Sequence, residues 1–217
     1  MDNKLVPAHI LFVKWFIRIR WIAIIILVIS NYVVSHLLDI SIQEIPVYIL
    51  AAALFVLNVL HRIILKQITK DKGSKVTNKI KWEIHFQIIT DLIILTLILH
   101  YSGGIENPLI LFYFFHLIIA SSIFSTLQSY FYAAFALILA ALLGILECYS
   151  IIPHYPLEGF VSHDLYQNVL YVFGTGFIFA CTSVLVVSLS HMIIYRSIFH
   201  PSSLYLSSID STTLTPS

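Results

Sequence analysis

Six long apolar runs alternate with short polar segments along the chain. They cover residues 21–38, 45–65, 84–101, 109–127, 131–152 and 170–194. Each is close to the length of about 20 residues that a helix needs to cross ~30 Å of hydrocarbon. Stretches such as IAIIILVI and LIILTLIL do not alternate in polarity, which favours helices over the strands of a β-barrel. The pattern predicts an all-α, polytopic membrane protein with six transmembrane helices over residues 1–196. A Ser/Thr-rich, disordered tail is expected over 197–217.

The composition supports placement in a lipid bilayer. Of the 217 residues, 59% are hydrophobic and 11% are charged, and the mean hydropathy is +0.93. Soluble domains carry about 25% charged residues, so this chain has too few charges to cover a surface in water. The net charge of +1 provides no basic excess for a nucleic-acid partner.

The lysines and arginines predict the orientation in the membrane. With six spans, all 12 of them fall on one side: before the first span, in or beside the loop over 66–83, and after the sixth span. Basic residues are enriched on the cytoplasmic side of membrane proteins, so both termini are expected in the cytoplasm. A cleaved signal peptide over residues 1–36 is the alternative. Its apolar run exceeds the roughly 7–15 residues of a signal core, which favours a retained span.

Ionisable side chains inside the predicted spans are candidates for chemistry. Asp91 lies well inside the third span, and it either joins helices or takes part in sensing or proton transfer. His100 ends the same span and, at about 100° per residue, points nearly opposite to Asp91. His116 lies near the middle of the fourth span. A haem or metal ligated by both histidines is the alternative to interhelical hydrogen bonds. A depth difference of about 12 Å disfavours it, so no metal site is predicted.

Glu147 ends the fifth span near His154, where it is expected to line the mouth of a pocket. Four small residues before it share one helical face, along which membrane helices pack closely. They are Ala133, Ala136, Ala140 and Gly144. Small residues of the sixth span, including Gly174 and Gly176, predict a second closely packed helix.

The segment SGGIENP over residues 102–108 joins the third and fourth spans. Gly103 and Gly104 allow backbone conformations that a side chain forbids. Asn107 fits a helix N-cap, and Pro108 fits the first helical turn. A tight helical hairpin explains this composition without a ligand. Alternatively, exposed amides of the turn and of the following helix bind a carbonyl-bearing ligand.

The run GGIENPL resembles the GGxxNPF heptapeptide of the RegB/PrrB family of redox-sensing histidine kinases. Those proteins have a six-span input domain with the heptapeptide between spans three and four. The resemblance implies a signal-input module in which Gly103, Gly104, Asn107 and Pro108 match the motif implicated in quinone binding. Leu109 stands where the family has Phe. The resemblance also implies a homodimer in the inner membrane of a bacterium.

The 217 residues contain neither an HExxxP phosphoacceptor box nor a Gly-rich nucleotide box. The expectation is therefore a sensor domain without its catalytic domains, with no catalytic residues and no autophosphorylation. A small transporter or channel-like protein that uses Asp91, His116 and Glu147 is the alternative function. A membrane protease is disfavoured because no HExxH pair is present.

Overall fold

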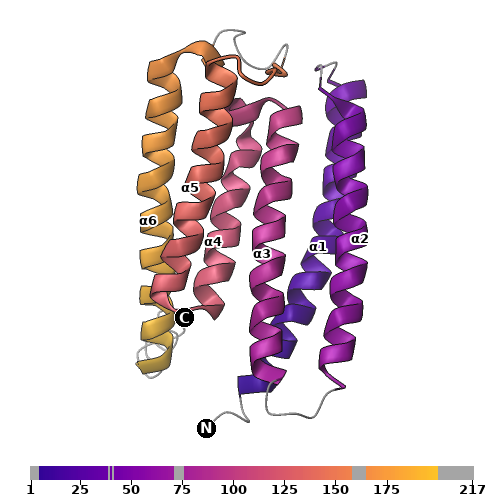
Figure 1. Cartoon of the computed structure of the whole chain (residues 1–217), viewed down its shortest axis with the longest axis vertical. Coiled ribbons are helices and arrows are strands. Elements are labelled where there is room, and N and C mark those ends of the chain that lie inside the picture. Colours follow the sequence, from indigo (N-terminus) through magenta and orange to yellow (C-terminus); the bar gives the residue numbers. More distant parts are fainter. Residues whose placement is uncertain (1–4, 39, 41, 71–75, 158–164, 200–217) are drawn as a thin grey trace, which may run out of the picture.

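The protein is a bundle of long helices (Figure 1). The structure, a computed structural model, describes residues 5–38, 40, 42–70, 76–157 and 165–199, with the backbone alone at 5–9, 12 and 196–199. Within these ranges it is all-helical and has no β-strand, as predicted. The α-helices are α1 (Leu5–His36), α2 (Glu44–Ile68), α3 (Val76–Tyr101), α4 (Phe112–Ile123), α5 (Thr126–Cys148) and α6 (Val169–Phe199). Short 3-10 helices are η2 (Gly104–Glu106), η3 (Pro108–Leu111) and η4 (Leu165–Gln167). Most of the predicted tail, residues 200–217, lies outside the described residues.

Among the described residues, five helices are long and apolar enough to cross a membrane. These segments are Val13–His36, Glu44–Ile68, Val76–Tyr101, Thr126–Cys148 and Val169–Tyr195. The fourth predicted span is shorter, because η3 and α4 together cover only Pro108–Ile123. At about 1.5–2 Å per residue this segment is about 26 Å long, slightly less than ~30 Å of hydrocarbon. The membrane helices are therefore supported, and a sixth span is a proposal.

The boundary predicted between the fourth and fifth helices is wrong. The apolar run continues to residue 127, but α4 ends at Ile123, and Phe124 and Ser125 adopt extended conformations. Gln128 Oε1 accepts hydrogen bonds from the backbone N–H of Ser125 at 3.2 Å and from its hydroxyl at 3.1 Å. These hydrogen bonds between an N-cap Ser and a Gln three residues later mark the start of α5 at Thr126.

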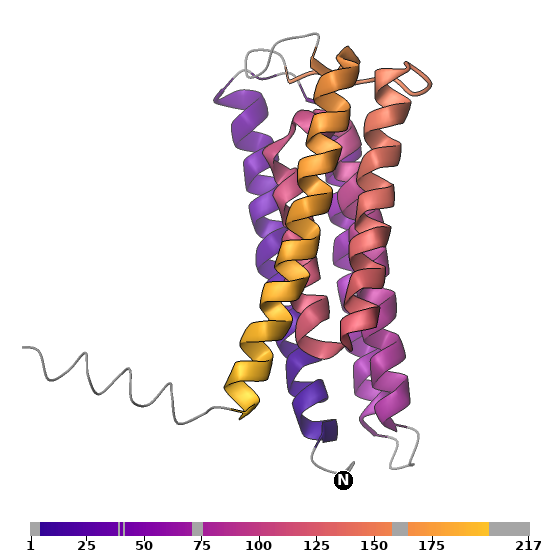
Figure 2. The same ribbon diagram turned by 90° about the vertical axis from the view of Figure 1, so that its left-hand side faces the viewer.

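Helix α3 lies at the centre of the bundle. It contacts α1 and α2 on one side and α4 and α5 on the other. It is also the most buried candidate span, with 56% of its apolar window inside the protein against 17% for α6. From the side, α6 lies next to α5 and across α4 (Figure 2). Polar groups carried by α3 therefore meet partners from several helices.

The small residues of α5 and α6 have different surroundings. Ala133, Ala136, Ala140 and Gly144 are buried, as expected for a closely packed face. A Cβ built on Gly144 would lie 3.1 Å from Ile105 Cγ2 and 3.3 Å from Val172 Cγ1. The same expectation is wrong for Gly174 and Gly176, because a Cβ on either would meet nothing within 4 Å. Within the described chain, these two glycines border open space.

Candidate functional site

The turn between α3 and η3 has the backbone geometry that its glycines allow. Gly103 has φ of +109° and Gly104 has φ of +58°, both in the region that side chains avoid. Asn107 caps η3, since its Oδ1 accepts from the backbone N–H of Leu109 at 2.8 Å. The amide of Asn107 also donates to Ser102, at 2.5 Å to the carbonyl and 2.8 Å to the hydroxyl. Asn107 therefore holds both ends of the turn.

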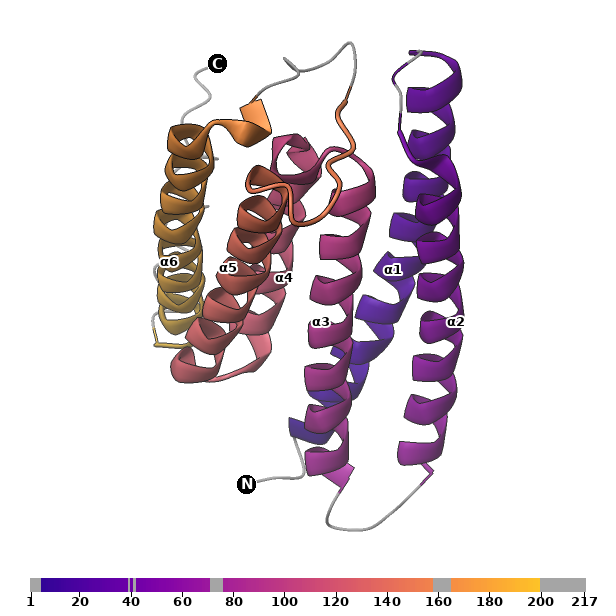
Figure 3. The same ribbon diagram turned by 45° about the horizontal axis from the view of Figure 1, so that its top comes forward.

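The turn is buried, whereas the ligand hypothesis expected exposed amides. Every residue from Ser102 to Asn107 is buried, and Pro108 is exposed. The segment after α5, residues 149–157, crosses this end of the bundle (Figure 3) and covers the turn. We call it the covering segment. A Cβ on Gly103 would lie only 2.5 Å from Cγ of Leu157, a side chain of this covering segment. The glycines thus allow both the sharp bend and the close approach of another segment.

A cluster of two carboxylates and two histidines joins the turn to α3, α5 and the covering segment. Glu147 is its centre: Oε1 lies 2.8 Å from Nδ1 of His100, and Oε2 lies 2.8 Å from Nδ1 of His154. His154 Nε2 lies 3.7 Å from Oε2 of Glu106, which belongs to the turn. We call these four residues, His100, Glu106, Glu147 and His154, the turn cluster.

The turn cluster is almost completely shielded from solvent. The side chains of Glu106, Glu147 and His154 are at most 2% exposed, and that of His100 is 14% exposed. Two of its buried atoms, Oε1 of Glu106 and Nε2 of His154, lack a hydrogen-bond partner among the described residues. Burial raises the pKa of Glu106 above its ordinary value of 4.5. The neighbouring His154 and a hydrogen bond from the Tyr166 backbone oppose this rise in pKa, while the charge of Glu147 adds to it.

Aromatic rings enclose the turn cluster from the outside. The ring of His154 stacks on Tyr166 of η4, with centroids 3.9 Å apart and planes inclined by 17°. Tyr155 contacts the rings of His100 and Tyr101, at centroid distances of 5.3 Å and 5.6 Å. These rings replace water around the charged groups, which strengthens the interactions among them.

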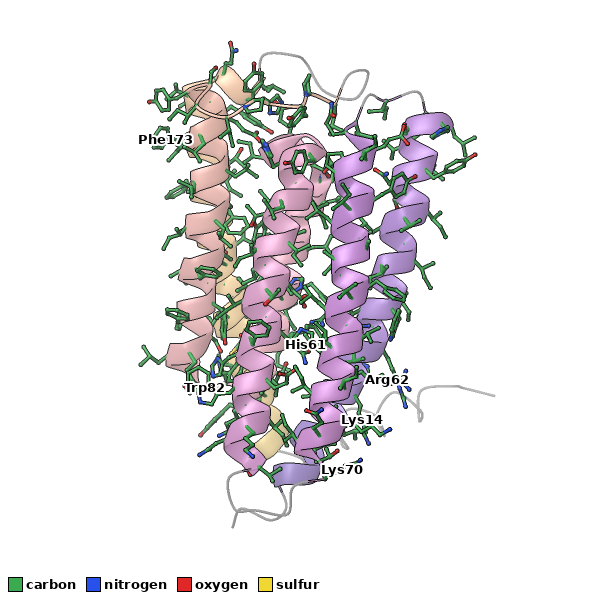
Figure 4. The ribbon with its side chains drawn as sticks, turned by 45° about the vertical axis from the view of Figure 1, so that its right-hand side comes forward. Lys14, His61, Arg62, Lys70, Trp82 and Phe173 are labelled. Atoms are coloured by element: carbon green, nitrogen blue, oxygen red, sulfur yellow. The ribbon has the colours of Figure 1, made fainter. Side chains whose placement is uncertain are left out.

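An apolar groove of 330 Å³ lies where α5 and α6 meet the turn. Ile105 of η2 and Ile110 of η3 line it, and Ala140 and Gly144 contribute to the α5 side. The α6 side includes Phe173, Thr175, Gly176 and Phe177. Phe173 and Phe177 are 59% and 71% exposed, so the groove opens on the outer surface of the helices. Figure 4 shows Phe173 at the end of the bundle opposite to Lys14 and Lys70. Leu109, which replaces the Phe of the heptapeptide, is partly buried against the core and does not line this groove.

Asp91 belongs to a separate polar cluster in the bundle interior. Its Oδ2 lies 2.5 Å from Arg20 of α1 and 3.9 Å from Nε2 of His116 on α4. Arg20 was expected at the cytoplasmic edge before the first span; this is wrong, because the candidate span begins at Val13 and Arg20 is only 5% exposed. The ion pair with Arg20 supports the interpretation of Asp91 as a link between helices.

The structure divides the predicted polar residues between two sites. Asp91 and His116 lie together, whereas His100 and Glu147 belong to the turn cluster. Asp91 and His100 are nine residues apart on α3, or about 14 Å along its axis. Between them, Thr96 bonds to the hydroxyl of Tyr113 at 2.6 Å among buried apolar side chains. The described residues thus form discrete polar sites.

Several polar partners were missed by sequence reasoning. Asn58 lies beside Arg20, and His61 bonds to Glu83 at 2.6 Å, with Gln87 donating to the same carboxylate at 3.1 Å. Figure 4 shows His61 within the bundle, well below Phe173. Glu106 and His154 were visible in the sequence as ionisable residues in two different connections between apolar spans. No local pattern indicates that these two residues meet.

Comparison with family models, curated proteins and solved structures finds no match to this chain. Among the described residues, no group of three or more His, Cys, Asp or Glu side chains is arranged to hold a metal ion. The two described cysteines, Cys148 and Cys181, are free thiols. The turn, its cluster and the adjoining groove are therefore the features from which a function can be inferred.

Proposed function

We propose that the chain is a six-span membrane input module of the sensor-histidine-kinase type, with both termini in the cytoplasm. The positions of the basic residues support this orientation. Lys14, Arg62 and Lys70 lie toward the end of the bundle where α1 begins and α6 ends (Figures 1 and 4). The turn lies at the other end. α4, though short, then completes an even number of spans, with modest local thinning of the bilayer.

The ligand we propose is a lipophilic ring compound of the quinone type, bound in the groove between α5 and α6. One observation carries this proposal: the groove is lined by Ile105, inside the heptapeptide, and by Ile110, just after it. An apolar site of 330 Å³ is within the usual range for small ligands. Thr175 provides a hydroxyl that can donate to a ligand carbonyl.

A ligand at this position acts on the helix that leads to the C-terminal end of the chain. The groove separates α6 from α5 beside Gly144 and Gly176, so an occupant favours one packing of α6 over another. A signal requires that the ligand bind these two packings with unequal affinity. The resemblance to the kinases adds a homodimer, a bacterial inner membrane and catalytic domains outside these 217 residues as parts of the same proposal.

The test is to fill the groove without disturbing the turn. Gly176→Leu places a side chain in the groove, and nothing lies within 4 Å of the new Cβ. Gly174→Leu is the matched control, because its Cβ also meets open space but Gly174 does not line the groove. Binding of a radiolabelled short-chain ubiquinone to the purified protein in lipid nanodiscs is measured at pH 7 for all three proteins.

We expect saturable binding by the wild type and by Gly174→Leu, and at least tenfold weaker binding by Gly176→Leu. A tenfold loss corresponds to about 1.4 kcal/mol of binding free energy. Absence of saturable binding in the wild type would exclude a quinone ligand. Equal binding by both variants would remove the groove from the proposal.

A further inference from the structure

A cavity of 510 Å³ lies at the end of the bundle opposite to the turn cluster, between the end of α2 and the start of α3. It is lined by Ile68, Asn78, Lys79, Trp82 and Glu83. Ile68 is the last residue of α2, and the other four lie at the start of α3. Figure 4 shows Trp82 toward the same end as Lys14 and Lys70. The lining is therefore distinct from the turn and from the groove between α5 and α6.

The position of the cavity along α3 corresponds to the lipid headgroups. Helix α3 has 26 residues and is about 39 Å long, whereas the hydrocarbon of a bilayer is ~30 Å thick. About 9 Å of the helix therefore extends beyond the hydrocarbon. The side chains of Asn78 and Lys79 are exposed, and polar groups favour the headgroup region, which places this excess at the first turns of α3. Trp82 is 75% exposed, and an amphipathic indole ring is typical of the membrane interface.

The exposed surface around the cavity is cationic. The lysines described in or beside the last turn of α2 and the first turns of α3 are all exposed: Lys66, Lys70, Lys79 and Lys81. Among the described residues over 66–83, the one carboxylate is that of Glu83, and its side chain is only 7% exposed. Oε1 of Glu83 lies 2.6 Å from Nδ1 of His61 and accepts from the amide of Gln87 at 3.1 Å. The negative charge is therefore held inside the bundle, whereas the positive charges are on the surface.

The lining combines groups that fit a phosphate with groups that fit hydrocarbon. The ammonium group of Lys79 has three hydrogen-bond donors, and the amide of Asn78 has two more. Ile68 and the ring of Trp82 provide apolar surface in the same cavity. A soluble anion would use only the polar groups. A phospholipid would use both kinds, because its phosphate is joined through glycerol to acyl chains. The volume of 510 Å³ lies within the usual range for binding sites of small ligands.

We propose that this cavity binds an anionic phospholipid, with the phosphate at Asn78 and Lys79 and the glycerol region against Ile68 and Trp82. A headgroup with a net negative charge, such as phosphatidylglycerol, is favoured over a zwitterionic one, because the surrounding lysines attract a charge that the headgroup itself does not neutralise. The bound lipid joins the end of α2 to the start of α3 at the membrane surface. This site goes beyond the proposed input function and requires neither a quinone nor catalytic domains.

Native mass spectrometry of the purified full chain in detergent tests this proposal. The chain is titrated with phosphatidylglycerol or with phosphatidylcholine of the same acyl chains, and the dissociation constant of the first bound lipid is measured. Ammonium acetate at about 0.15 M screens charges more than ~8 Å from the phosphate. Lys79→Gln removes the charge that lines the cavity, and Lys79→Arg keeps it. Lys81→Gln is the matched control, because Lys81 is an exposed lysine of the same helix that lies about 200° around it and outside the lining.

We expect the wild type to bind phosphatidylglycerol at least about fivefold more tightly than phosphatidylcholine, and Lys79→Gln to lose this preference. A fivefold change corresponds to about 1 kcal/mol, which is the contribution of one lysine near an anionic headgroup. Lys79→Arg and Lys81→Gln should bind phosphatidylglycerol within about twofold of the wild type.

Equal affinity of the wild type for the two lipids would overturn the proposal. The same conclusion would follow from unchanged binding by Lys79→Gln, from loss of the preference in Lys79→Arg, or from equal losses in Lys79→Gln and Lys81→Gln. Displacement of the first phosphatidylglycerol by inorganic phosphate would assign the cavity to a soluble anion, which also contradicts a lipid site.

Discussion

Replacing Gly104 by alanine tests the contact between the turn and Glu147. A Cβ on Gly104 would lie 2.9 Å from Cδ of Glu147 and closer still to Oε2. A flexible side chain often gives way to a new methyl group. Glu147 is only 1% exposed, and its two oxygens are bonded to His100 and His154, so it has little freedom to move.

The expected cost has two parts. Gly104 has φ of +58°, and a residue with a Cβ loses about 1–2 kcal/mol in this left-handed conformation. The new methyl group also displaces Oε2 from Nδ1 of His154, and a hydrogen bond to a charged group contributes about 1.5–3 kcal/mol. Gly104→Ala should therefore lower the free energy of unfolding by about 2.5–5 kcal/mol.

The free energy of unfolding is measured by SDS titration in mixed micelles, followed by circular dichroism. Gly174→Ala is the matched control: its Cβ meets open space within α6, so we expect an increase of up to about 1 kcal/mol from helix propensity. In a Glu147→Ala background the carboxylate that the methyl group meets is removed. The cost of Gly104→Ala should then fall to the conformational part, about 1–2 kcal/mol.

Two results would refute this reasoning. A loss below about 0.5 kcal/mol for Gly104→Ala would show that the turn accepts a side chain, as an ordinary surface position does. An equal loss in the wild-type and Glu147→Ala backgrounds would show that the carboxylate is not what the methyl group meets.

Three further predictions concern the Arg20–Asp91 ion pair, the cap of η3 and phosphorylation of the chain. Arg20→Met leaves the Asp91 charge buried and should cost about 3–5 kcal/mol of unfolding free energy. Adding Asp91→Leu should recover most of this loss, and a double variant less stable than Arg20→Met would contradict the ion pair. Asn107→Ala removes the cap of η3 and the bonds to Ser102, so it should cost about 1–2 kcal/mol and speed amide exchange at Leu109, which unchanged exchange would contradict. The purified 217-residue chain should not autophosphorylate, so stable label on a histidine after incubation with labelled ATP and Mg²⁺ would contradict the proposed input module.

The parts of the site that sequence reasoning anticipated depend on neighbours along the chain. Asn107 caps a helix whose first residue is Pro108, and both roles follow from contacts two residues apart. The glycine pair predicted an unusual backbone, and the structure has two consecutive positive φ angles there. The start of α5 was also encoded locally, in Ser125 and Gln128, but the continuous apolar run concealed it. Apolar length alone does not locate a break between two membrane helices.

The partners of polar residues that lie far apart in the chain could not be obtained from the sequence. Arg20 and Asp91 are 71 residues apart, and His100 and Glu147 are 47 apart. Whether such residues meet depends on the rotation and depth of each helix, and a rotation of about 100° per residue turns a contact into an exposed position. For the same reason the small residues of α5 are packed, whereas Gly174 and Gly176 of α6 border open space.

The sequence by itself determined that the chain forms apolar helices and that its turn at 102–108 is sharp. Both follow from backbone physics, because in lipid each backbone polar group needs an internal partner and because only glycine adopts these φ angles readily. The tertiary structure decided that α3 lies at the centre and that the turn is covered by the segment after α5. It also decided that Glu147 holds two histidines. These features arise from packing among helices distant in the chain, where shape and buried charge select one arrangement that no local pattern specifies.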